Sequence, residues 1–352
     1  MFNILSFFLS LPLLKKHAMA EKSFSDISIV EAMDELYRLS AYKPVENLCF
    51  RSDKGGVETS AQRMFLEGID FNLVYFPLKH LGYKCVVETV GELYAAMASP
   101  KALGVVLGIS AKLDFPQIRE LWTGVVVAAK EHGVESVKLD LQPSQNGLYL
   151  SISAFGEMSH LTRARMHKPQ SKDLICVSGS LGAAYLGLRL MEKGADEFSR
   201  TGKQPDIQQY RMIVGDYLRP EISAGIVERL EDAEIYPSCG YLLRRGLADT
   251  LKRLNRATGL GAKVYADKIP FEGNSFQLGR ELDIDPISAA MNGGDDCRLL
   301  FVVPILKLEK FRHDFQTFSI IGHLALPEAG VSLVTPDGVE LPVKAQGWPV
   351  EE

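Results

Sequence analysis

The sequence has few of the features that mark several large classes of protein. Its 352 residues include only five cysteines, and none forms a C-x-x-C pair or stands at a zinc-like spacing from a histidine. These absences argue against a zinc site or a disulfide framework and favour a reducing, cytoplasmic location. Basic runs are also missing, and 39 basic residues against 44 acidic ones give a net charge of −5. Nucleic acid is therefore not expected as a partner.

An apolar stretch opens the sequence, MFNILSFFLSLPLL, but it is too short and too interrupted to span a bilayer. A secretory signal would carry lysine or arginine before its apolar run, whereas Lys15 and Lys16 follow this one. We therefore interpret residues 1–18 as an extension that precedes a start at Met19. A signal peptide, with AMA as its cleavage site, and an ordered segment are the alternatives. No membrane partner is expected.

The remaining composition, 46% apolar and 24% charged, is that of an ordinary globular protein whose length predicts two domains. Helical periodicity is present near 78–98 and 116–132, and the runs ALGVVLGIS and GLYLSISAFG predict strands. The polar segment 160–173 contains a proline, and we place the domain boundary there. The predicted regions are a helical segment at 19–45, an N-terminal domain at 46–158 and a C-terminal domain at 160–348.

The second half begins with LICVSGSLGAAYLGLRLM, which predicts a strand, a glycine turn and a helix. Helical patterns follow at 206–217, 221–231 and 241–258. Strands are predicted at 262–267, 298–304 and 317–324, and the TPDG turn at 335–338 separates two final strands. This mixture predicts an α/β or α+β class.

Two short patterns could carry chemistry. In VSGSLG, the residues Ser178, Gly179 and Ser180 stand between a strand and a helix, where free backbone N–H groups can bind a phosphate; an ordinary tight turn is the alternative. In MNGGDDCRLLF, the adjacent Asp295 and Asp296 need a cation or hydrogen-bond donors to offset their repulsion. Mg²⁺ prefers such oxygen ligands, and a solvated acidic turn is the alternative.

Four stretches, taken in order, resemble the thiamine-monophosphate kinase family, within the superfamily related to aminoimidazole ribonucleotide synthase. They are FLEGIDF…YFPLKHLGYK, DLICVSGSLGAAYLGLRLM, MNGGDDCRLLFVVP and FSIIGHL. They are similar to the family's V-E-G-V-H-F, D-L-V-Y-V-T-G-T-L-G, G-G-E-D-Y-E-L-L-F and closing I-G-x-[IV] patterns. The similarity covers roughly residues 45 to 348 and implies the two-domain α/β fold of that superfamily.

The resemblance also implies ligands and partners. Members of the family bind ATP and several Mg²⁺ ions between domains, phosphorylate thiamine monophosphate, and pair through their N-terminal domains as homodimers. Carried over position by position, it implies metal ligands at Glu92, Asp140, Asp295 and Asp296, although Glu92 and Asp140 taken singly would be ordinary surface acids. Nucleotide or phosphate contacts are implied at the serine–glycine turn and at Ser238 and Gly240.

The departures from the family fall on the residues that its chemistry uses. The family's first metal motif is replaced by ENLCFRSDKGGVE, which keeps only Asp53 as an acid. The acid of its S-T-D pattern is replaced by Arg63, which would repel Mg²⁺. Asp70 stands in place of the histidine that contacts substrate.

Further acids are lost in the later motifs. The family's G-G-D-T-T pattern keeps Asp140 but carries Lys138 in place of a glycine. Its D-x-S-D-G-L pattern keeps Ser238 and Gly240, while Tyr236 and Cys239 replace the acids. Pairing of Cys239 with Cys297 across the cleft is one alternative, and two buried thiols are the other.

These changes predict that Mg²⁺ and ATP binding is weakened or lost. Arg63 and Lys138 would instead meet a phosphate directly. Two hypotheses follow: an impaired thiamine-monophosphate kinase, or an inactive relative that binds a nucleotide or a phosphorylated ligand, or partners another protein. Trp348 either stacks on the ring of the substrate or anchors the surface.

Overall fold

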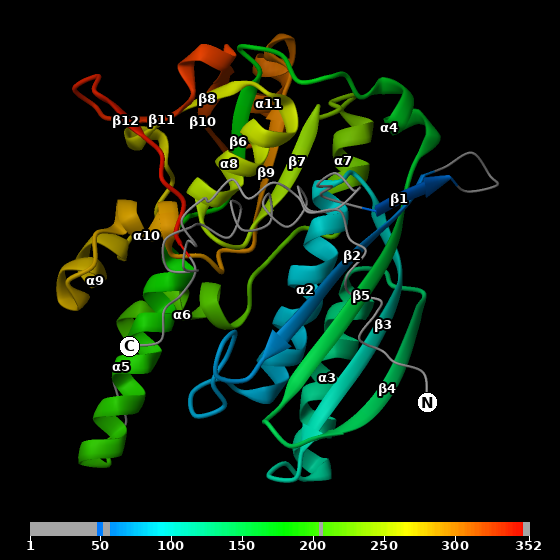
Figure 1. Ribbon diagram of the computed structural model, residues 1–352, viewed down its shortest axis with the longest axis vertical. Helices are drawn as coiled ribbons and strands as arrows, with labels where there is room; N and C mark the ends of the chain where they lie inside the picture. The colour runs from blue at the N-terminus through cyan, green and yellow to red at the C-terminus, as the bar shows by residue number, and fades with distance from the viewer. Residues whose placement is uncertain (1–47, 52–56, 204–206, 348–352) are drawn as a thin grey trace, which may run out of the picture. The chain divides into compact units, whose positions relative to one another are not determined.

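The computed structural model describes residues 48–51, 57–203 and 207–347. The described residues from 48 to 346 form one compact unit that contains two β-sheets (Figure 1). The expected mixed α/β class is therefore confirmed. The predictions for residues 1–45, for Asp53 and for Trp348 lie outside the described residues.

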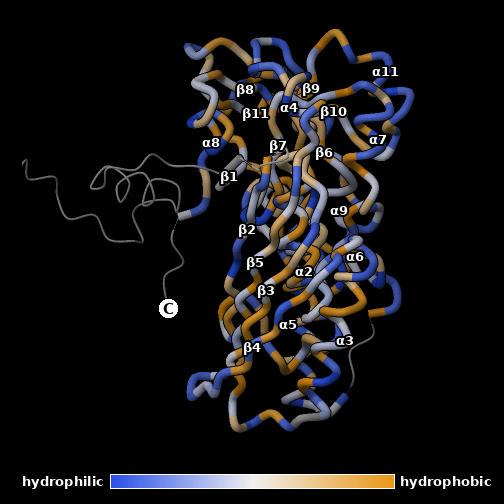
Figure 2. Tube along the Cα trace, turned by 90° about the vertical axis from the view of Figure 1, so that its right-hand side faces the viewer, coloured by the Kyte–Doolittle hydropathy of each residue, from blue (hydrophilic) through white to orange (hydrophobic). Residues whose placement is uncertain are grey.

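The first sheet has five strands in the order β1-β2-β5-β3-β4, namely Leu48–Arg51, Val57–Leu66, Tyr149–Met158, Ser99–Ser110 and Ser136–Ser144. Only β3 and β4 are parallel, and they are joined through α3 (Phe115–Glu131). Along β5 the buried Leu150, Ile152 and Ala154 alternate with residues of the opposite face. The sheet therefore has one apolar face and one exposed face, and Figure 2 colours the residues along these strands by hydropathy.

Helix α2 (Leu78–Ala95) covers the apolar face of this sheet together with α3. Two glycines allow the helices to approach closely. A Cβ atom on Gly82 would lie 2.1 Å from the Leu121 carbonyl oxygen, and one on Gly124 would lie 1.9 Å from the Lys79 carbonyl oxygen. Because no other residue fits at these crossings, both helices are fixed in register.

The second sheet has seven strands in the order β12-β11-β8-β10-β6-β9-β7, namely Glu340–Pro342, Val331–Val334, Gly261–Tyr265, Phe318–Ala325, Leu174–Ser178, Arg298–Val303 and Cys239–Leu243. The inner strands β6 and β9 are almost entirely buried, as expected for strands that are covered on both faces. The remaining helices are α4 (His160–Arg165), α5 (Ala183–Thr201), α6 (Arg211–Leu218), α7 (Ile226–Asp232), α8 (Leu247–Thr258), α9 (Ser275–Leu282), α10 (Pro286–Asn292) and α11 (Leu308–Asp314).

One apolar core extends from the first sheet through α2 to the second. Its buried members include Val90 and Leu93 of α2 and also Cys176 and Phe301 of the second sheet. Gly91 of α2 faces Leu242 of β7, and a Cβ atom there would lie 2.8 Å from that side chain. Helix α2 therefore carries its side chains directly to the place where the two sheets meet. The domain boundary at 160–173 stays a prediction.

Most predicted elements are found, and two need correction. Of the helix predicted at 221–231, only the part from Ile226 onward is helical, as α7. The helices predicted near 78–98 and 116–132 are α2 and α3, and the strand–turn–helix of residues 174–191 is β6 and the start of α5. The segment predicted as a single helix at 241–258 instead begins in strand β7 and becomes helical only at Leu247. The apolar run CGYLL is too short for its periodicity to distinguish a strand from a helix.

Candidate functional site

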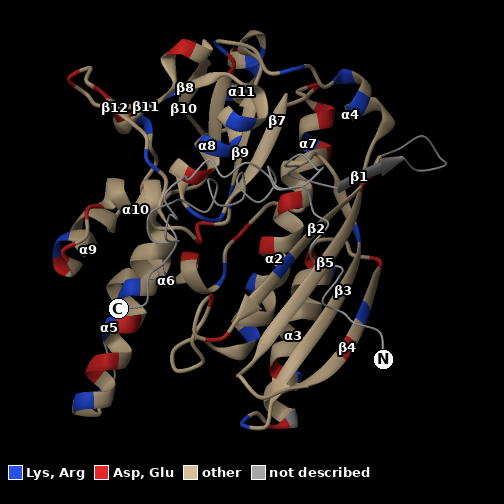
Figure 3. Cartoon of the chain, in the orientation of Figure 1, with Lys and Arg blue, Asp and Glu red and all other residues tan. Residues whose placement is uncertain are grey.

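Two charged residues lie among the buried residues of helix α2. Lys84 and Glu88 are one helical turn apart, and both are almost fully buried, with 5% and 1% of their side chains exposed. Burying a charge is costly unless it is paired. The residues that pair with them define the candidate site, and Figure 3 shows both signs of charge along α2.

Arg63 of β2 is the first partner. Its guanidinium group lies 2.5 Å from the Glu88 carboxylate and 3.4 Å from that of Asp70. Burial alone would lower the pKa of Arg63, but Glu88, Asp295 and Asp70 outweigh it and raise the pKa. Burial raises the pKa of Glu88, against the opposing effect of Arg63. Arg63 therefore remains charged and neutralises an acid of its own chain.

Lys84 connects α2 to the turn before β9. Its ammonium nitrogen lies 3.1 Å from an Asp295 carboxylate oxygen and 3.7 Å from Glu88. The same nitrogen lies 4.2 Å from the centre of the Tyr217 ring, within cation–π distance. Burial alone would lower the pKa of Lys84, but the carboxylates of Asp295 and Glu88 outweigh this effect and raise the pKa. Lys84 is therefore a fixed cation among two carboxylates and an aromatic ring.

The glycines of MNGGDDC set the position of Asp295. Gly294 and Asp295 both have left-handed backbones, with φ of 86° and 61°. The Asp295 N–H donates to the Arg244 carbonyl oxygen at 2.7 Å. Arg244 in turn forms a 2.9 Å ion pair with Glu92 of α2. Glu92 lies on the same helix as Glu88, one turn further along the chain.

Asp296 has a different environment from its neighbour. Its carboxylate accepts hydrogen bonds from the backbone N–H groups of Gly182 at 2.8 Å and Ala184 at 3.3 Å, at the start of α5. A carboxylate is favourable at a helix N-terminus, where the N–H groups lack partners within the helix. Burial nevertheless raises the pKa of Asp296 to about 7, although the Gly182 hydrogen bond opposes this rise. The position where a phosphate was expected thus holds the protein's own carboxylate.

The serine–glycine turn is also engaged within the chain. The Ser178 hydroxyl accepts a hydrogen bond from the Leu299 N–H at 2.9 Å, and the Ser180 hydroxyl donates to Asp216 at 3.3 Å. Arg298 forms a 2.7 Å ion pair with Asp216. A Cβ atom on Gly179, whose φ is 60°, would lie 2.9 Å from Arg298.

A cavity of about 460 Å³ opens beside this turn and is lined by Ser178, Gly179 and Arg298. The turn therefore borders a cavity large enough for a small ligand, and Arg298 lies beside the turn.

The other predicted residues lie apart from this group. Ser238 donates both its hydroxyl and its N–H to the Val302 carbonyl oxygen, at 3.1 and 2.8 Å. A Cβ atom on Gly240 would lie 2.3 Å from the Ala95 carbonyl oxygen, so this glycine permits contact between β7 and α2. Lys138 and Asp140 lie on the exposed edge strand β4 and pair in register with Gly104 and Val106 of β3.

Strand alternation separates Asp140 from Arg63. Arg63 pairs in register with Ile152, whose side chain faces α2, whereas Asp140 pairs with Val106, between the buried Val105 and Leu107. Because neighbouring residues of a strand point to opposite faces, Asp140 lies on the face away from the helices. Within the chain, the structure brings together Arg63, Asp70 and Asp295, with Glu92 nearby on α2, but not Asp140 or Lys138.

Sequence reasoning missed Glu88 and Arg244, although both are central to these ion pairs. The sequence does contain a signal for Glu88. It stands four residues after Lys84 in the middle of a mostly apolar helical segment, where charged residues need partners. Arg244 has no such local signal, because its partner is distant in sequence.

The carboxylates of the described residues do not gather into a metal site. In the ranges 48–51, 57–203 and 207–347, no three His, Cys, Asp or Glu side chains gather closely enough to hold an ion. Asp295 contacts Lys84, Glu92 contacts Arg244 and Asp296 contacts backbone donors. The donor set described here therefore does not fit the Mg²⁺ ions that the resemblance implies.

Comparison with known proteins agrees with this fold. Residues 51–158 match the family described as AIR synthase related protein, N-terminal domain. A thiamine-monophosphate kinase of Pyrococcus horikoshii is 28% identical over 271 residues, which cover 76% of this chain and 78% of the relative. The sequence is therefore similar to thiamine-monophosphate kinases and, over residues 51–158, to AIR synthase related proteins.

Solved structures of thiamine-monophosphate kinases share the architecture. The Aquifex aeolicus enzyme superposes with a TM-score of 0.70 at 20% identity, covering 89% of this chain and 97% of that one. AaThiL complexed with AMPPCP and TMP gives a TM-score of 0.71 at 19% identity, covering 91% and 94%. The expected α/β fold, that of the solved thiamine-monophosphate kinases, is thereby confirmed. Among the residues described in this chain, no helix is long and apolar enough to cross a membrane.

Proposed function

We propose that this thiamine-monophosphate kinase-like protein binds a nucleotide or a phosphorylated small molecule between its sheets, and that its transfer of phosphate from ATP to thiamine monophosphate is impaired. The observation that carries this proposal is the buried ion-pair group of Arg63, Lys84, Glu88 and Asp295. These cations already neutralise the acids that a metal would need.

Phosphoryl transfer of this kind depends on positioning and on neutralising charge, and the protein does little covalent chemistry. A Mg²⁺ ion entering this group would meet two fixed positive charges. Even at an effective dielectric constant of 20, two unit charges about 4 Å apart interact by roughly 4 kcal/mol. An incoming cation would therefore have to displace Lys84 or Arg63 from buried carboxylates.

The cations near the cavity beside the serine–glycine turn support binding of an anion. Arg298 lines that cavity and already contacts the Ser180 carbonyl oxygen at 3.3 Å. Arg229 lines the same cavity from α7. Guanidinium groups bind phosphate through paired hydrogen bonds, so they can hold an anion without a metal.

We also propose a homodimer. The exposed face of the first sheet carries large apolar side chains, including Met64 with 55% and Phe155 with 42% of their surface exposed. A second copy covering this face would bury them and lie over Asp140 and Lys138, which share it. Sedimentation velocity should show a dimer for the native chain and a monomer for Met64→Lys/Phe155→Lys. A native chain that is monomeric at micromolar concentration would contradict the proposed homodimer.

Thermal unfolding with and without ligands tests the binding site. ATP should raise the melting temperature of the metal-free protein, and adding Mg²⁺ should not increase the rise. The variant Arg63→Asp introduces a carboxylate beside Glu88 and Asp295, so Mg²⁺ should now stabilise the protein. Lys101→Asp is the matched control, because it makes the same charge change at an exposed position of β3.

A direct assay with ATP, Mg²⁺ and thiamine monophosphate completes the test. Little or no thiamine diphosphate is expected from the native protein. Product formed at an ordinary enzymatic rate would show that the proposed impairment is wrong. If ATP stabilises only when Mg²⁺ is present, the metal-free mode of binding is wrong.

A further inference from the structure

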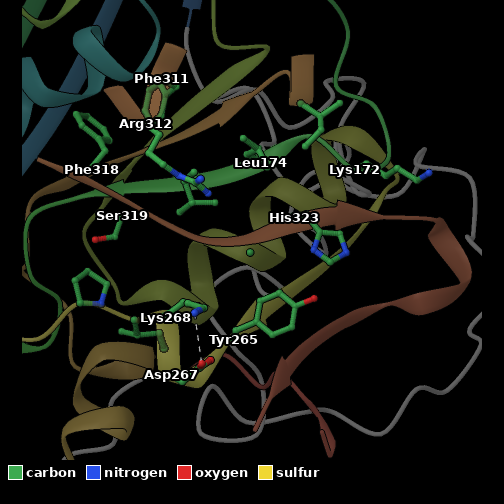
Figure 4. Close-up of a pocket in the computed structure, with 15 residues that line it drawn as sticks. Lys172, Leu174, Tyr265, Asp267, Lys268, Phe311, Arg312, Phe318, Ser319 and His323 are labelled. Atoms are coloured by element: carbon green, nitrogen blue, oxygen red, sulfur yellow. Dashed lines mark ion pairs between the residues drawn. The ribbon is translucent and has the colours of Figure 1, made fainter. Parts of the chain in front are cut away.

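A separate pocket lies on the second sheet, away from the ion pairs of α2. It has a volume of about 820 Å³, within the range of small-molecule sites. Figure 4 shows strand β10 crossing it, with Leu174 and Arg312 on one side and Tyr265, Asp267 and Lys268 on the other. None of the residues predicted from the sequence lines this pocket, so it is not explained by the proposed function.

The floor of the pocket is apolar and aromatic. Leu174 of β6, Ile320 of β10 and Ile269 contribute aliphatic surface, and Phe318 lies at one end. Tyr265 and His323 face each other with ring centres 5.9 Å apart and an angle of 31° between their planes. Burial and nearby Lys263 lower the pKa of His323, so this ring is neutral near pH 7. A flat, uncharged ring system would bury its surface here.

The rim of the pocket is positively charged, although the protein as a whole is acidic. Lys172, Lys268 and Arg312 come from three separate elements, and among the described lining residues Asp267 is the one acid. The existing ion pairs of these cations are long: Lys268 lies 3.7 Å from Asp267, and Arg312 lies 3.8 Å from Glu309. All four side chains are at least half exposed, so these pairs hold the cations only weakly.

A buried carboxylate fixes the geometry of this rim. Asp173, which is 6% exposed, accepts hydrogen bonds from the N–H groups of Gln170 at 2.9 Å and Ile305 at 3.4 Å. It thereby joins the loop that carries Lys172 to the segment that leads into α11 and Arg312. Lys172 itself has a left-handed backbone, with φ of 77°, and its N–H donates to the Leu324 carbonyl oxygen. The backbone positions that carry Lys172 and Arg312 are therefore set before any ligand arrives.

We propose that this pocket binds a small molecule that joins a flat ring to a phosphate group. The ring would lie against the apolar floor beside Tyr265 and His323, and the phosphate would contact Arg312 and Lys268. Charge-assisted hydrogen bonds to these residues supply affinity, and the floor supplies the preference for a ring. This proposal does not depend on the function proposed for the ion-pair site.

Backbone NMR with AMP as the probe tests both the location and the chemistry. AMP should shift the amide signals of Gly322 and His323 in the pocket; shifts at Ser178 and Gly179 would instead report the separate cavity of the proposed function. Adenosine lacks the phosphate and ribose 5-phosphate lacks the flat adenine base, so each should bind several-fold more weakly than AMP.

Charge reversal at the rim, Lys268→Glu/Arg312→Glu, should weaken AMP binding at least about tenfold, which corresponds to about 1.4 kcal/mol. Lys193→Glu/Arg200→Glu is the matched control, because it reverses two exposed charges on α5. It should change the affinity by less than about twofold.

Three results would overturn the proposal. The first is that AMP at about 10 mM, well above the Kd of a millimolar site, does not shift the Gly322 or His323 signals. The second is that the control variant weakens AMP binding as much as the rim variant does. The third is that ribose 5-phosphate binds as tightly as AMP.

Discussion

The ion-pair group on α2 and the pocket on the second sheet use the same kinds of cation in opposite ways. Arg63 and Lys84 are 14% and 5% exposed and lie directly against carboxylates. Lys268 and Arg312 are 60% and 64% exposed, in ion pairs 3.7 and 3.8 Å long. These two cations are therefore more available to a ligand than Arg63 and Lys84, which the fold already pairs in a dry environment.

The first way to break this comparison is to remove one acid from a buried ion pair and one from an exposed ion pair. Glu88→Ala leaves Arg63 and Lys84 buried beside fewer negative charges, so unfolding free energy should fall by about 3–5 kcal/mol. Glu135→Ala removes the partner of Lys101, in a pair whose side chains are 67% and 49% exposed. That loss should be below about 1 kcal/mol.

Chemical denaturation of the native protein and the two variants measures both losses. Similar values for Glu88→Ala and Glu135→Ala would show that burial does not distinguish the two settings.

The second test acts on the rim of the pocket. Asp173→Ala removes the acceptor for the Gln170 and Ile305 N–H groups, so about 1–3 kcal/mol of stability should be lost. AMP affinity should fall as well, because Lys172 and Arg312 would no longer be held in place. Hydrogen exchange at Gln170 and Ile305 should accelerate, and unchanged exchange with weaker AMP binding would contradict this positioning role.

Salt should weaken the electrostatic interactions of the pocket more than those of the ion-pair group on α2. In 0.5 M NaCl the screening length falls to roughly 4 Å, which weakens exposed charges more than buried ones. AMP binding at the pocket should therefore decline, while the destabilisation caused by Glu88→Ala should change little. Titration and denaturation at two salt concentrations check this, and AMP binding that is insensitive to salt would argue against contacts between its phosphate and the rim.

The smallest expected effect concerns pH. The pKa of His323 is lowered in the folded protein from 6.5, its value in an unfolded chain. The native state then binds fewer protons, so the contribution of this group to stability is lost as the pH falls below 6.5.

His323→Gln should be within about 0.5 kcal/mol of the native protein at pH 7.5 and should lose less stability on acidification. Denaturation at pH 7.5 and 5.5 measures this difference, and identical pH dependence in both proteins would show that His323 makes no such contribution.

Much of the fold could be read from the sequence. The long apolar periodicity of residues 78–95 specified a helix, and the glycines around Asp295 specified a turn before a strand. The start of residues 241–258 was assigned wrongly, because a five-residue apolar run fits a strand and a helix equally well. Boundaries fixed by tertiary packing, such as the start of α8 at Leu247, had no local signal of their own.

The sequence by itself determined which charged residues the chain has and where acids are missing from the family's pattern. Only the tertiary structure decided what each charge contacts. Lys84 and Asp295 are 211 positions apart, and Asp296 reaches the start of α5 across 112 or more residues. Such pairs form because α2 and the second sheet pack together, and their energies depend on burial, which no local stretch of sequence records.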